Sequence, residues 1–424
     1  MLGSGFREAM RLFRVGLPLV VVGLVAGCGG RPYGTLVATQ PDPKAATVDL
    51  MVATTRAPVA EPAGVMFGGS RGADLNFADI TVSIPPDRAA GEMRWPSSGP
   101  ADAARDFAVL RTDRMTLAEA KANFNRRVKA VPGRRVLLFV HGFNTRFEEA
   151  VYRFAQIVHD SPVKVAPILF TWPSGGSLTD YVYDRDSALY SRDPLERIIQ
   201  TITSDPNVGS VSILAHSMGS YVTVEALRQM SIRNRGLPPK LRDVMLAAPD
   251  IDVDVFRRQI ASIDASRRSA QFTIFVSRED RALSISSFIA RDSTRLGSLD
   301  PAAEPYASML AASNVKVVDL TTVESKDFTN HGKFANGEVL QAIGSRMASG
   351  QRLNDGSGGV IDAVGALAGG TIGLAASAAT QAVTAPGRLL DPTLQERSVG
   401  TTTQAPSLGG LDDESGKPDR RSRR

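Results

Sequence analysis

The sequence predicts an α/β protein with a mostly parallel central sheet covered by helices on both faces. From Arg134 onward, short apolar runs of strand length alternate with segments of helical periodicity. This alternation is typical of parallel sheets. A chain of 424 residues, 43% of them hydrophobic, can bury a core of that size. Polar residues of catalytic type follow several predicted strands, at the edge where open sheets place their sites.

The residues before this alternation predict an N-terminal β extension, over residues 47–132, that packs on the core. Strands are expected at Val48–Thr55, Asp79–Pro85 and Asp106–Leu110, because β-branched and apolar residues there are bounded by turn signals. Thr116 and Glu119 then form a capping-box pattern. The helix that follows is expected to end near Pro132, and its apolar face consists of Leu117, Ala120, Phe124 and Val128.

Residues 133–348 are the predicted α/β core, with helical segments around residues 148–159 and 194–202. Apolar runs of strand length predict six strands in this region. They are Arg135–Val140, Val165–Trp172, Val211–Ala215, Asp243–Pro249, Gln271–Ser277 and Val315–Leu320.

Residues 1–28 have the pattern of an export signal. Three arginines precede the apolar run Val15–Ala26, which is too short to favour a permanent spanning helix. The run ends in V-A-G-C, which resembles the bacterial lipobox, whose cysteine becomes the lipidated first residue of the mature chain. We therefore expect Cys28 to anchor the protein to a membrane of the cell envelope, facing outside the cytoplasm. An uncleaved N-terminal anchor is the alternative, and it predicts the same location.

Low-complexity segments flank the predicted folded region. Residues 29–46 are rich in Gly, Pro, Thr and Gln and predict a tether. Residues 349–424 change to small and then charged residues, so we expect a mainly disordered tail. Within it, Ala363–Ala379 is uncharged and carries the small-residue repeats Gly365–Gly369 and Gly369–Gly373. Its weak hydrophobicity favours a flexible or surface-associated tail over a second membrane contact.

The charge balance argues against a nucleic-acid-binding protein. Lys and Arg number 49 against 44 Asp and Glu, for a net charge of +5, and the basic run RRSRR is confined to the C-terminus. The sequence contains no RNA-binding signature, no zinc-knuckle spacing and no H-E-x-x-H motif, so a zinc mechanism is not expected either. A single cysteine leaves no intrachain disulfide.

The stretch V-S-I-L-A-H-S-M-G places Ser217 between a buried strand and a helix. A serine at such a boundary either caps the helix or is a nucleophile on a strained turn. His141-Gly142-Phe143-Asn144 follows an earlier strand, and Gly142 allows a sharp turn there. We expect the backbone N–H groups of Phe143 and Met218 to converge as an oxyanion hole. The positive end of the helix adds to that stabilisation.

A serine hydroxyl needs a base to remove its proton, and the usual base is a histidine oriented by a carboxylate. The chain has four histidines, and His331, after the last strand, is the candidate. His141 belongs to the turn, His159 lies in a helical pattern, and His216 adjoins the serine but is expected to point to the other side of the elbow.

Asp280, after the strand before the last, is the first candidate for the carboxylate. The order Ser217, Asp280, His331 matches the chain order of hydrolases with this strand pattern. Asp250 is the alternative acid and ranks second, and Asp252 beside it also competes, although aspartates in loops are commonly turn formers.

Together these motifs resemble the α/β-hydrolase superfamily, and the wider pattern resembles its largely uncharacterised bacterial esterase/lipase-like branch of lipoproteins. The motifs in order are VATTR, FGGSRG with VSIP, HGFN, TWPS, AHSMG, APDID and REDRAL, and they cover Val48–Ile343. One departure is Ala215, which stands where the G-x-S-x-G motif has its first glycine and adds a methyl group at a crowded turn.

The resemblance implies a membrane-anchored serine hydrolase that cleaves carboxylic esters. Ser217 attacks the ester carbonyl, His331 carries the proton and Asp280 orients the imidazole, with an acyl-enzyme intermediate that water releases. The implied partners are an ester substrate and the membrane, and no metal or organic cofactor is implied. Two alternatives stay open: a non-catalytic envelope lipoprotein that uses the scaffold for binding, and an acyltransferase or peptidase with the same triad.

Two connections, Ser174–Asp193 and Ser284–Ser313, are expected to form the wall or lid of the substrate site. Tyr181, Tyr183 and Tyr190 in the first connection either line an acyl pocket or pack the loop.

Overall fold

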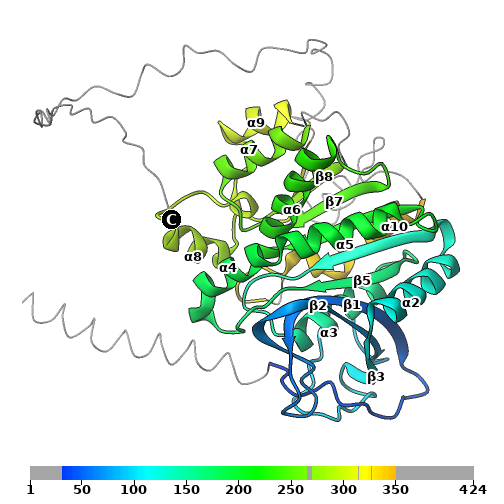
Figure 1. Ribbon diagram of the computed structural model, residues 1–424. Helices are drawn as coiled ribbons and strands as arrows, with labels where there is room; N and C mark the ends of the chain where they lie inside the picture. Colours follow the sequence, from blue (N-terminus) through cyan, green and yellow to red (C-terminus); the bar gives the residue numbers. More distant parts are fainter. Residues whose placement is uncertain (1–30, 265–269, 314, 326, 350–424) are drawn as a thin grey trace, which may run out of the picture. The chain divides into compact units, whose positions relative to one another are not determined.

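The computed structural model describes residues 31–264, 270–313, 315–325 and 327–349. These residues form an α/β-hydrolase-like fold around a nine-stranded sheet with the strand order β3-β2-β1-β5-β4-β6-β7-β8-β9 (Figure 1). The predicted export signal with Cys28, and the predicted tail with Ala363–Ala379, lie outside the described residues.

The sheet is mostly parallel, as predicted. Neighbouring strands are parallel from β1 across to β9, and the two antiparallel pairs are β1 with β2 and β2 with β3. Every predicted strand is present, but β2 begins well before the predicted Asp79. The strands are β1 Ala46–Pro58, β2 Phe67–Ile84, β3 Ala108–Met115, β4 Arg135–Val140, β5 Ala166–Thr171, β6 Ser210–His216, β7 Leu241–Ala247, β8 Gln271–Val276 and β9 Val315–Asp319.

The N-terminal strands continue the sheet instead of forming a layer upon it. β1 lies between β2 and β5, with Met51 opposite Ile168 and Thr54 opposite Thr171. Because β1 runs parallel to β5, its carboxyl end reaches the sheet edge at which the core strands also end. Residues of the extension therefore contribute to the edge that carries the site.

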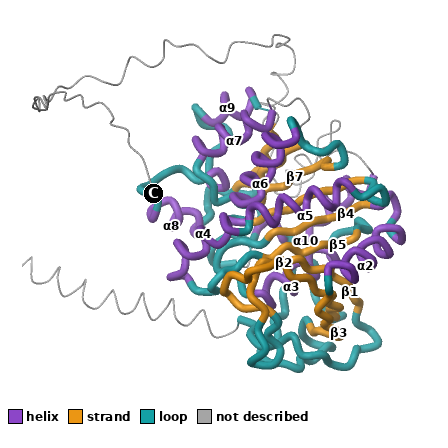
Figure 2. The backbone as a smooth tube through the Cα atoms, in the orientation of Figure 1, coloured by secondary structure: helices purple, strands orange, loops and turns teal. Residues whose placement is uncertain are grey.

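Helices cover both faces of the sheet (Figure 2). Along β4, Leu138 and Val140 face one hydrophobic cluster while Leu137 and Phe139 face the other, which explains why the strand is continuously apolar. The first cluster includes residues of α2 Leu117–Ala130, α5 Arg192–Ser204, α6 Met218–Asn234 and α7 Val253–Asp264. The second includes residues of α3 Phe147–Asp160 and α10 Gly337–Ser349. The remaining α-helices of the described residues are α4 Tyr181–Tyr190, α8 Arg281–Ile289 and α9 Tyr306–Ala312.

The predicted capping box at the start of α2 is present. The Thr116 hydroxyl accepts a hydrogen bond from the Glu119 backbone N–H at 3.3 Å, and the Glu119 carboxylate accepts one from the Thr116 N–H at 2.8 Å. Two of the otherwise unsatisfied N–H groups of the helix end are thereby paired, which fixes where α2 begins.

Residues 31–39 are held against the core, so the predicted tether does not extend over them, whereas residues 40–46 are mostly exposed. The Gly34 N–H donates to Glu148 at 3.0 Å, and Tyr152 donates to the Thr35 carbonyl oxygen at 3.1 Å. Leu36 is buried in the cluster beneath α3. The Gly- and Pro-rich composition indicated a flexible segment, but buried partners on α3 hold its backbone in one path.

Within the described residues, no helix combines the length and the apolar character needed to cross a membrane.

Candidate active site

Ser217 lies on a strained turn between β6 and α6. Its backbone has φ 52° and ψ −122°, a combination that is unfavourable for a residue with a side chain. Ser217 occupies the N-cap position of α6, but its side chain makes no capping hydrogen bond. Ser217 is therefore not an ordinary helix cap.

Two glycines make this turn possible. An added Cβ at Gly219 would lie 2.3 Å from the carbonyl oxygen of His141, and one at Gly142 would lie 2.9 Å from Ser217 Cβ. Both distances are far inside van der Waals contact, so neither position accepts a side chain without movement of the backbone. Ala215, in place of the motif's first glycine, is fully buried at the end of β6 and is accommodated there.

The predicted oxyanion-hole residues flank Ser217. Phe143 follows Gly142, which lies against the Ser217 side chain, and its N–H donates no hydrogen bond to another described residue. Met218 is the first residue of α6, a position whose N–H has no acceptor within the helix. Both donors are thus available to an oxygen atom held next to Ser217, beside the positive end of the helix dipole.

The structure brings His331 and Asp280 together. His331 Nδ1 donates to Asp280 Oδ2 at 2.7 Å, and the other oxygen, Oδ1, accepts from the Leu283 N–H at 2.9 Å. Asp280 is completely buried, and it follows β8 while His331 follows β9. Burial lowers the pKa of His331, but the charge and hydrogen bond of Asp280 outweigh burial and raise this pKa above its ordinary value of 6.5.

The loop that carries His331 is held by a carboxylate. Asp327 accepts hydrogen bonds from the backbone N–H groups of His331 and Gly332, each at 3.0 Å. Among the three candidate residues, the described contacts contain the Asp280–His331 hydrogen bond but none from Ser217 to His331. Such a contact commonly tightens only when substrate binds.

Asp250, the alternative acid, is engaged elsewhere. Its two oxygens accept hydrogen bonds from Ser286 at 2.6 Å and from Tyr181 at 2.9 Å, and Arg295 forms an ion pair with it at 3.3 Å. Asp252 caps α7 by accepting hydrogen bonds from backbone N–H groups. These contacts tie the loop after β7 to α4 and α8.

His216 does not point away from the site, which corrects the sequence-based expectation. Its ring centroid lies 4.6 Å from that of His331, and its Nε2 lies 3.3 Å from the His331 carbonyl oxygen. Burial and the neighbouring His331 hold the pKa of His216 well below its ordinary value, so the ring is neutral. The residue before Ser217 thus supports the loop that carries His331.

His141 has a structural role, as predicted for the histidine of the turn. Its ring stacks on Trp172 with centroids 4.8 Å apart, and the Trp172 indole donates to the His141 carbonyl oxygen at 2.9 Å. Burial and the charge of Arg56 lower the pKa of His141 to about 3. The HGFN and TWPS motifs are therefore one packing unit.

The role of Arg56, the arginine of VATTR, is not among the predictions from the sequence. Its guanidinium is buried and donates to the carbonyl oxygens of Thr145 at 2.7 Å, Gly68 at 3.0 Å and Ser174 at 3.2 Å. Burial lowers its pKa to about 10, which leaves it charged at neutral pH. An arginine at the end of an apolar strand was the available signal, but only the strand order reveals its partners.

Asp184 on α4 also holds the turn after β4 and the loop after β5. It is fully buried and accepts hydrogen bonds from the Ser174 hydroxyl at 2.5 Å, the Gly175 N–H at 2.8 Å and the Asn144 N–H at 3.1 Å. Burial raises the pKa of this carboxyl group. Arg56 and Asp184 together fix the loop that presents Phe143.

A cavity of about 860 Å³ opens beside these groups. Gly142, His216 and His331 line it, together with Leu178 from the first of the two predicted wall segments. No residue of the second segment, Ser284–Ser313, lines it. The three candidate pocket tyrosines pack the loop instead, because Tyr181 binds Asp250 and Ser286 while Tyr183 and Tyr190 donate to backbone carbonyls of β2.

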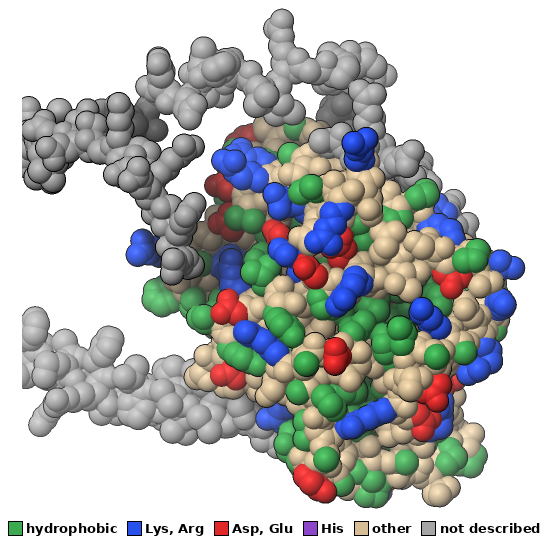
Figure 3. Space-filling model, viewed as in Figure 1, with side chains coloured by type: hydrophobic (Ala, Val, Ile, Leu, Met, Phe, Trp, Pro, Cys, Tyr) green, Lys and Arg blue, Asp and Glu red, His purple; other side chains and the backbone are tan. Residues whose placement is uncertain are grey.

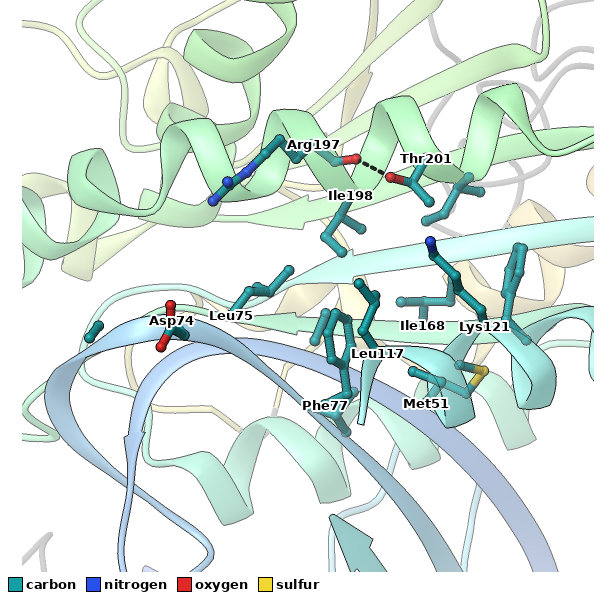
Figure 4. Close-up of a pocket in the computed structure, with 16 residues that line it drawn as sticks. Met51, Asp74, Leu75, Phe77, Leu117, Lys121, Ile168, Arg197, Ile198 and Thr201 are labelled. Atoms are coloured by element: carbon teal, nitrogen blue, oxygen red, sulfur yellow. Dashed lines mark hydrogen bonds between the residues drawn. The ribbon is translucent and has the colours of Figure 1, made fainter. Parts of the chain in front are cut away.

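A second hollow of about 550 Å³ lies between α2 and α5 (Figure 4). Its floor and walls are largely apolar, with Met51, Phe77 and Ile168 from the strands and Leu117 and Ile198 from the helices. No candidate catalytic residue lines it, whereas His331 lines the cavity of about 860 Å³. The described residues contain no group of three or more His, Cys, Asp or Glu side chains placed to hold a metal ion.

The fold and this arrangement define an α/β hydrolase. A family model described as an alpha/beta hydrolase of unknown function (DUF900) matches residues 116–346, more than half of the chain, and the chain belongs to this family. An uncharacterised protein of Nostoc sp. strain PCC 7120 is 27% identical over 133 residues. That match covers 25% of this chain and 34% of the relative's own length.

Similar solved structures include a siderophore hydrolase and an esterase. A siderophore hydrolase from Aspergillus nidulans shares 13% identity with a TM-score of 0.33, covering 74% of this chain and 99% of its own. A hyperthermophilic esterase from the archaeon Pyrobaculum calidifontis shares 10% identity with a TM-score of 0.28, covering 65% and 81% respectively. Similarity this low transfers no activity to the present chain.

Replacing Arg56 with Met should destabilise the protein strongly. The substitution keeps an apolar stem but removes the donor to the carbonyl oxygens of Gly68, Thr145 and Ser174, a loss of about 3–5 kcal/mol in the free energy of unfolding. Urea denaturation followed by circular dichroism measures this change. Arg105, whose side chain is 84% exposed, is the matched control, and Arg105→Met should change stability by less than about 0.5 kcal/mol. Equal stabilities for the two variants would contradict the role assigned to Arg56.

Proposed function

We propose that this protein is a serine hydrolase that cleaves carboxylic esters through Ser217, His331 and Asp280. The single observation that carries the proposal is the hydrogen bond of 2.7 Å between His331 and the buried Asp280, next to a serine on a strained strand-to-helix turn. Membership of an α/β-hydrolase family supports the same reaction class.

In the first step, Ser217 Oγ attacks the carbonyl carbon of the ester. His331 Nε2 removes the hydroxyl proton as the new C–O bond forms, and the carbonyl oxygen becomes an oxyanion. The Phe143 and Met218 N–H groups face that oxyanion, and the N-terminus of α6 stabilises its charge. Asp280 keeps the proton on Nδ1, so that Nε2 is the basic nitrogen.

The tetrahedral intermediate then collapses. The bond to the alcohol oxygen breaks, and His331 gives its proton to that oxygen, which leaves an acyl group on Ser217. In the second half, His331 takes a proton from water as the hydroxide oxygen attacks the acyl carbon. The Ser217–acyl bond breaks, the acid leaves and the serine recovers its proton from His331.

We also propose that the protein is held at the cell envelope by a lipid on Cys28. Support comes from the arginines, the short apolar run and the V-A-G-C sequence before the folded region. An acylated cysteine at that position places the hydrolase outside the cytoplasm, with an ester substrate and a membrane as its partners.

A fluorophosphonate probe should label the wild-type protein and fail to label Ser217→Ala. The probe reacts only with an activated serine, so His331→Ala should also reduce labelling by a factor on the order of 10³. The matched controls are Ser204→Ala and His159→Ala, both near helix ends and absent from the cavity lining. A folded wild type without labelling would favour the binding-scaffold alternative. Competition between water and added alcohols or amines for the acyl group distinguishes hydrolysis from acyl transfer.

Ester turnover should fall as the pH drops through the pKa of His331. Only the neutral imidazole removes the serine proton, and Asp280 raises the pKa of His331 above 6.5, so the acid limb should have its midpoint above 6.5. Asp280→Asn removes the charge, which should shift the midpoint to lower pH and reduce kcat on the order of 10³–10⁴-fold. Hydrolysis of p-nitrophenyl acetate between acid and neutral pH measures both effects. An unshifted midpoint in Asp280→Asn would exclude Asp280 as the partner of His331.

Cys28→Ser should abolish incorporation of labelled palmitate into the full chain expressed in a bacterial host, and should release the protein from the membrane fraction. The reason is that the thiol is the only acceptor for the lipid at the predicted processing site. Labelling and cell fractionation measure the two effects. Unchanged processing and retention would support the uncleaved N-terminal anchor instead.

A further inference from the structure

We propose that the mouth of the active-site cavity docks onto a lipid layer. The docking surface consists of six exposed apolar side chains, which we call the apolar rim: Leu178, Val182, Ile285, Phe288, Ile289 and Phe328. The part of this inference that concerns substrate rests on the proposed ester hydrolysis. It then follows that the substrate is an ester whose acyl chain resides in that layer.

The apolar rim is unusually exposed. Phe328 is 81%, Phe288 77% and Val182 70% accessible to solvent. On α8, Ile285, Phe288 and Ile289 have the i, i+3, i+4 spacing of one helix face, and this face is turned to solvent while Leu283 is buried. Exposed apolar side chains that occur singly over a surface need no explanation, but a group of them in one place marks an interaction surface.

Contacts made by neighbouring residues connect the segments that carry the apolar rim. Leu178 lines the cavity, as does Thr329, the neighbour of Phe328. The Tyr181 hydroxyl of α4 lies 2.9 Å from the Ser286 hydroxyl of α8, and the Arg281 guanidinium of α8 lies 4.7 Å above the Phe328 ring.

The figures agree with these contacts. In Figure 1, α4 and α8 lie side by side. The space-filling view shows hydrophobic side chains at the edge of the molecule where α8 lies (Figure 3).

The position of Arg31 favours a lipid layer over other occupants. Arg31 lines the cavity, pairs with Glu149 at 2.5 Å, and donates to the carbonyl oxygens of Asn144 at 2.6 Å and Gly176 at 3.1 Å. Gly176 is two residues from Leu178 of the apolar rim. Cys28 precedes Arg31 by three residues, which reach at most about 10 Å when fully extended. A lipid on Cys28 therefore begins beside the cavity mouth, and the layer that holds the lipid lies against the apolar rim.

Quenching by brominated lipid tests the contact directly. The full chain is reconstituted into phosphatidylcholine vesicles with or without bromine on the acyl chains, and tryptophan fluorescence is compared for Phe288→Trp and Ile232→Trp. Ile232 is 60% exposed near the far end of α6, about 22 Å along the helix from Ser217. Both variants keep Trp95, Trp172 and the same N-terminus. Bromine should quench Phe288→Trp and spare Ile232→Trp, whereas equal quenching would overturn the proposal.

A kinetic comparison separates docking from chemistry. The double variant Ile285→Ser with Phe288→Ser should hydrolyse dissolved p-nitrophenyl acetate at the wild-type rate. Its turnover of a diacylglycerol carried in phosphatidylcholine vesicles should fall about tenfold or more, because each lost apolar side chain weakens partition into the layer by about that factor. Ile232→Ser is the control and should leave both rates unchanged.

The outcomes distinguish the two proposals. Quenching of Phe288→Trp without hydrolysis of either ester supports docking and contradicts the proposed activity. Hydrolysis of dissolved ester without quenching supports the proposed activity and contradicts docking. Absence of quenching together with self-association that Phe288→Ser abolishes would assign the apolar rim to a second copy of the chain, and would overturn the docking proposal.

Discussion

The guanidinium of Arg56 connects three segments that must meet for the candidate site to exist. It bonds to carbonyl oxygens from β2, from the turn after β4 and from the loop after β5. Burying a cation costs several kcal/mol, and its hydrogen bonds offset that cost only while all three segments keep their places. The loop that carries Phe143 is consequently positioned by a residue of the N-terminal extension, outside the segment that the family model matches.

The strained turn at Ser217 depends on a similarly fixed backbone. The Ser217 N–H donates to the Ala247 carbonyl oxygen at 2.9 Å, and the Ser217 carbonyl oxygen accepts from the Ser220 and Asp250 N–H groups. Unfavourable backbone angles persist only where several surrounding contacts together hold the residue in that conformation. Here the end of β7, the loop after it and the first turn of α6 all form hydrogen bonds with the backbone of Ser217. The serine therefore cannot relax into an ordinary helix cap.

Sequence reasoning succeeded where the signal is local. The apolar runs predicted each strand, Thr116 and Glu119 predicted the start of α2, and the residues after β8 and β9 predicted that Asp280 and His331 would meet. It failed where the conformation of a residue depends on neighbours that are distant in the sequence. The orientation of His216 depends on the loop after β9, and the packing of residues 31–35 depends on polar groups of α3. The partners of Arg56 depend on the pairing of β1 with β5, which no short-range pattern encodes.

The place of β1 within the sheet also constrains the order of folding. The hydroxyl groups of Thr54 and Thr171 are bonded at 2.6 Å although the residues are 117 positions apart. Before β5 has been synthesised, only β3 is available to extend the pair of β1 and β2. A sheet of these three strands has β1 as an unpaired edge and is weakly stable in water. Pairings between such distant strands also form slowly. The growing chain therefore leaves one edge of β1 unpaired until Thr171, 117 positions after Thr54, has been synthesised.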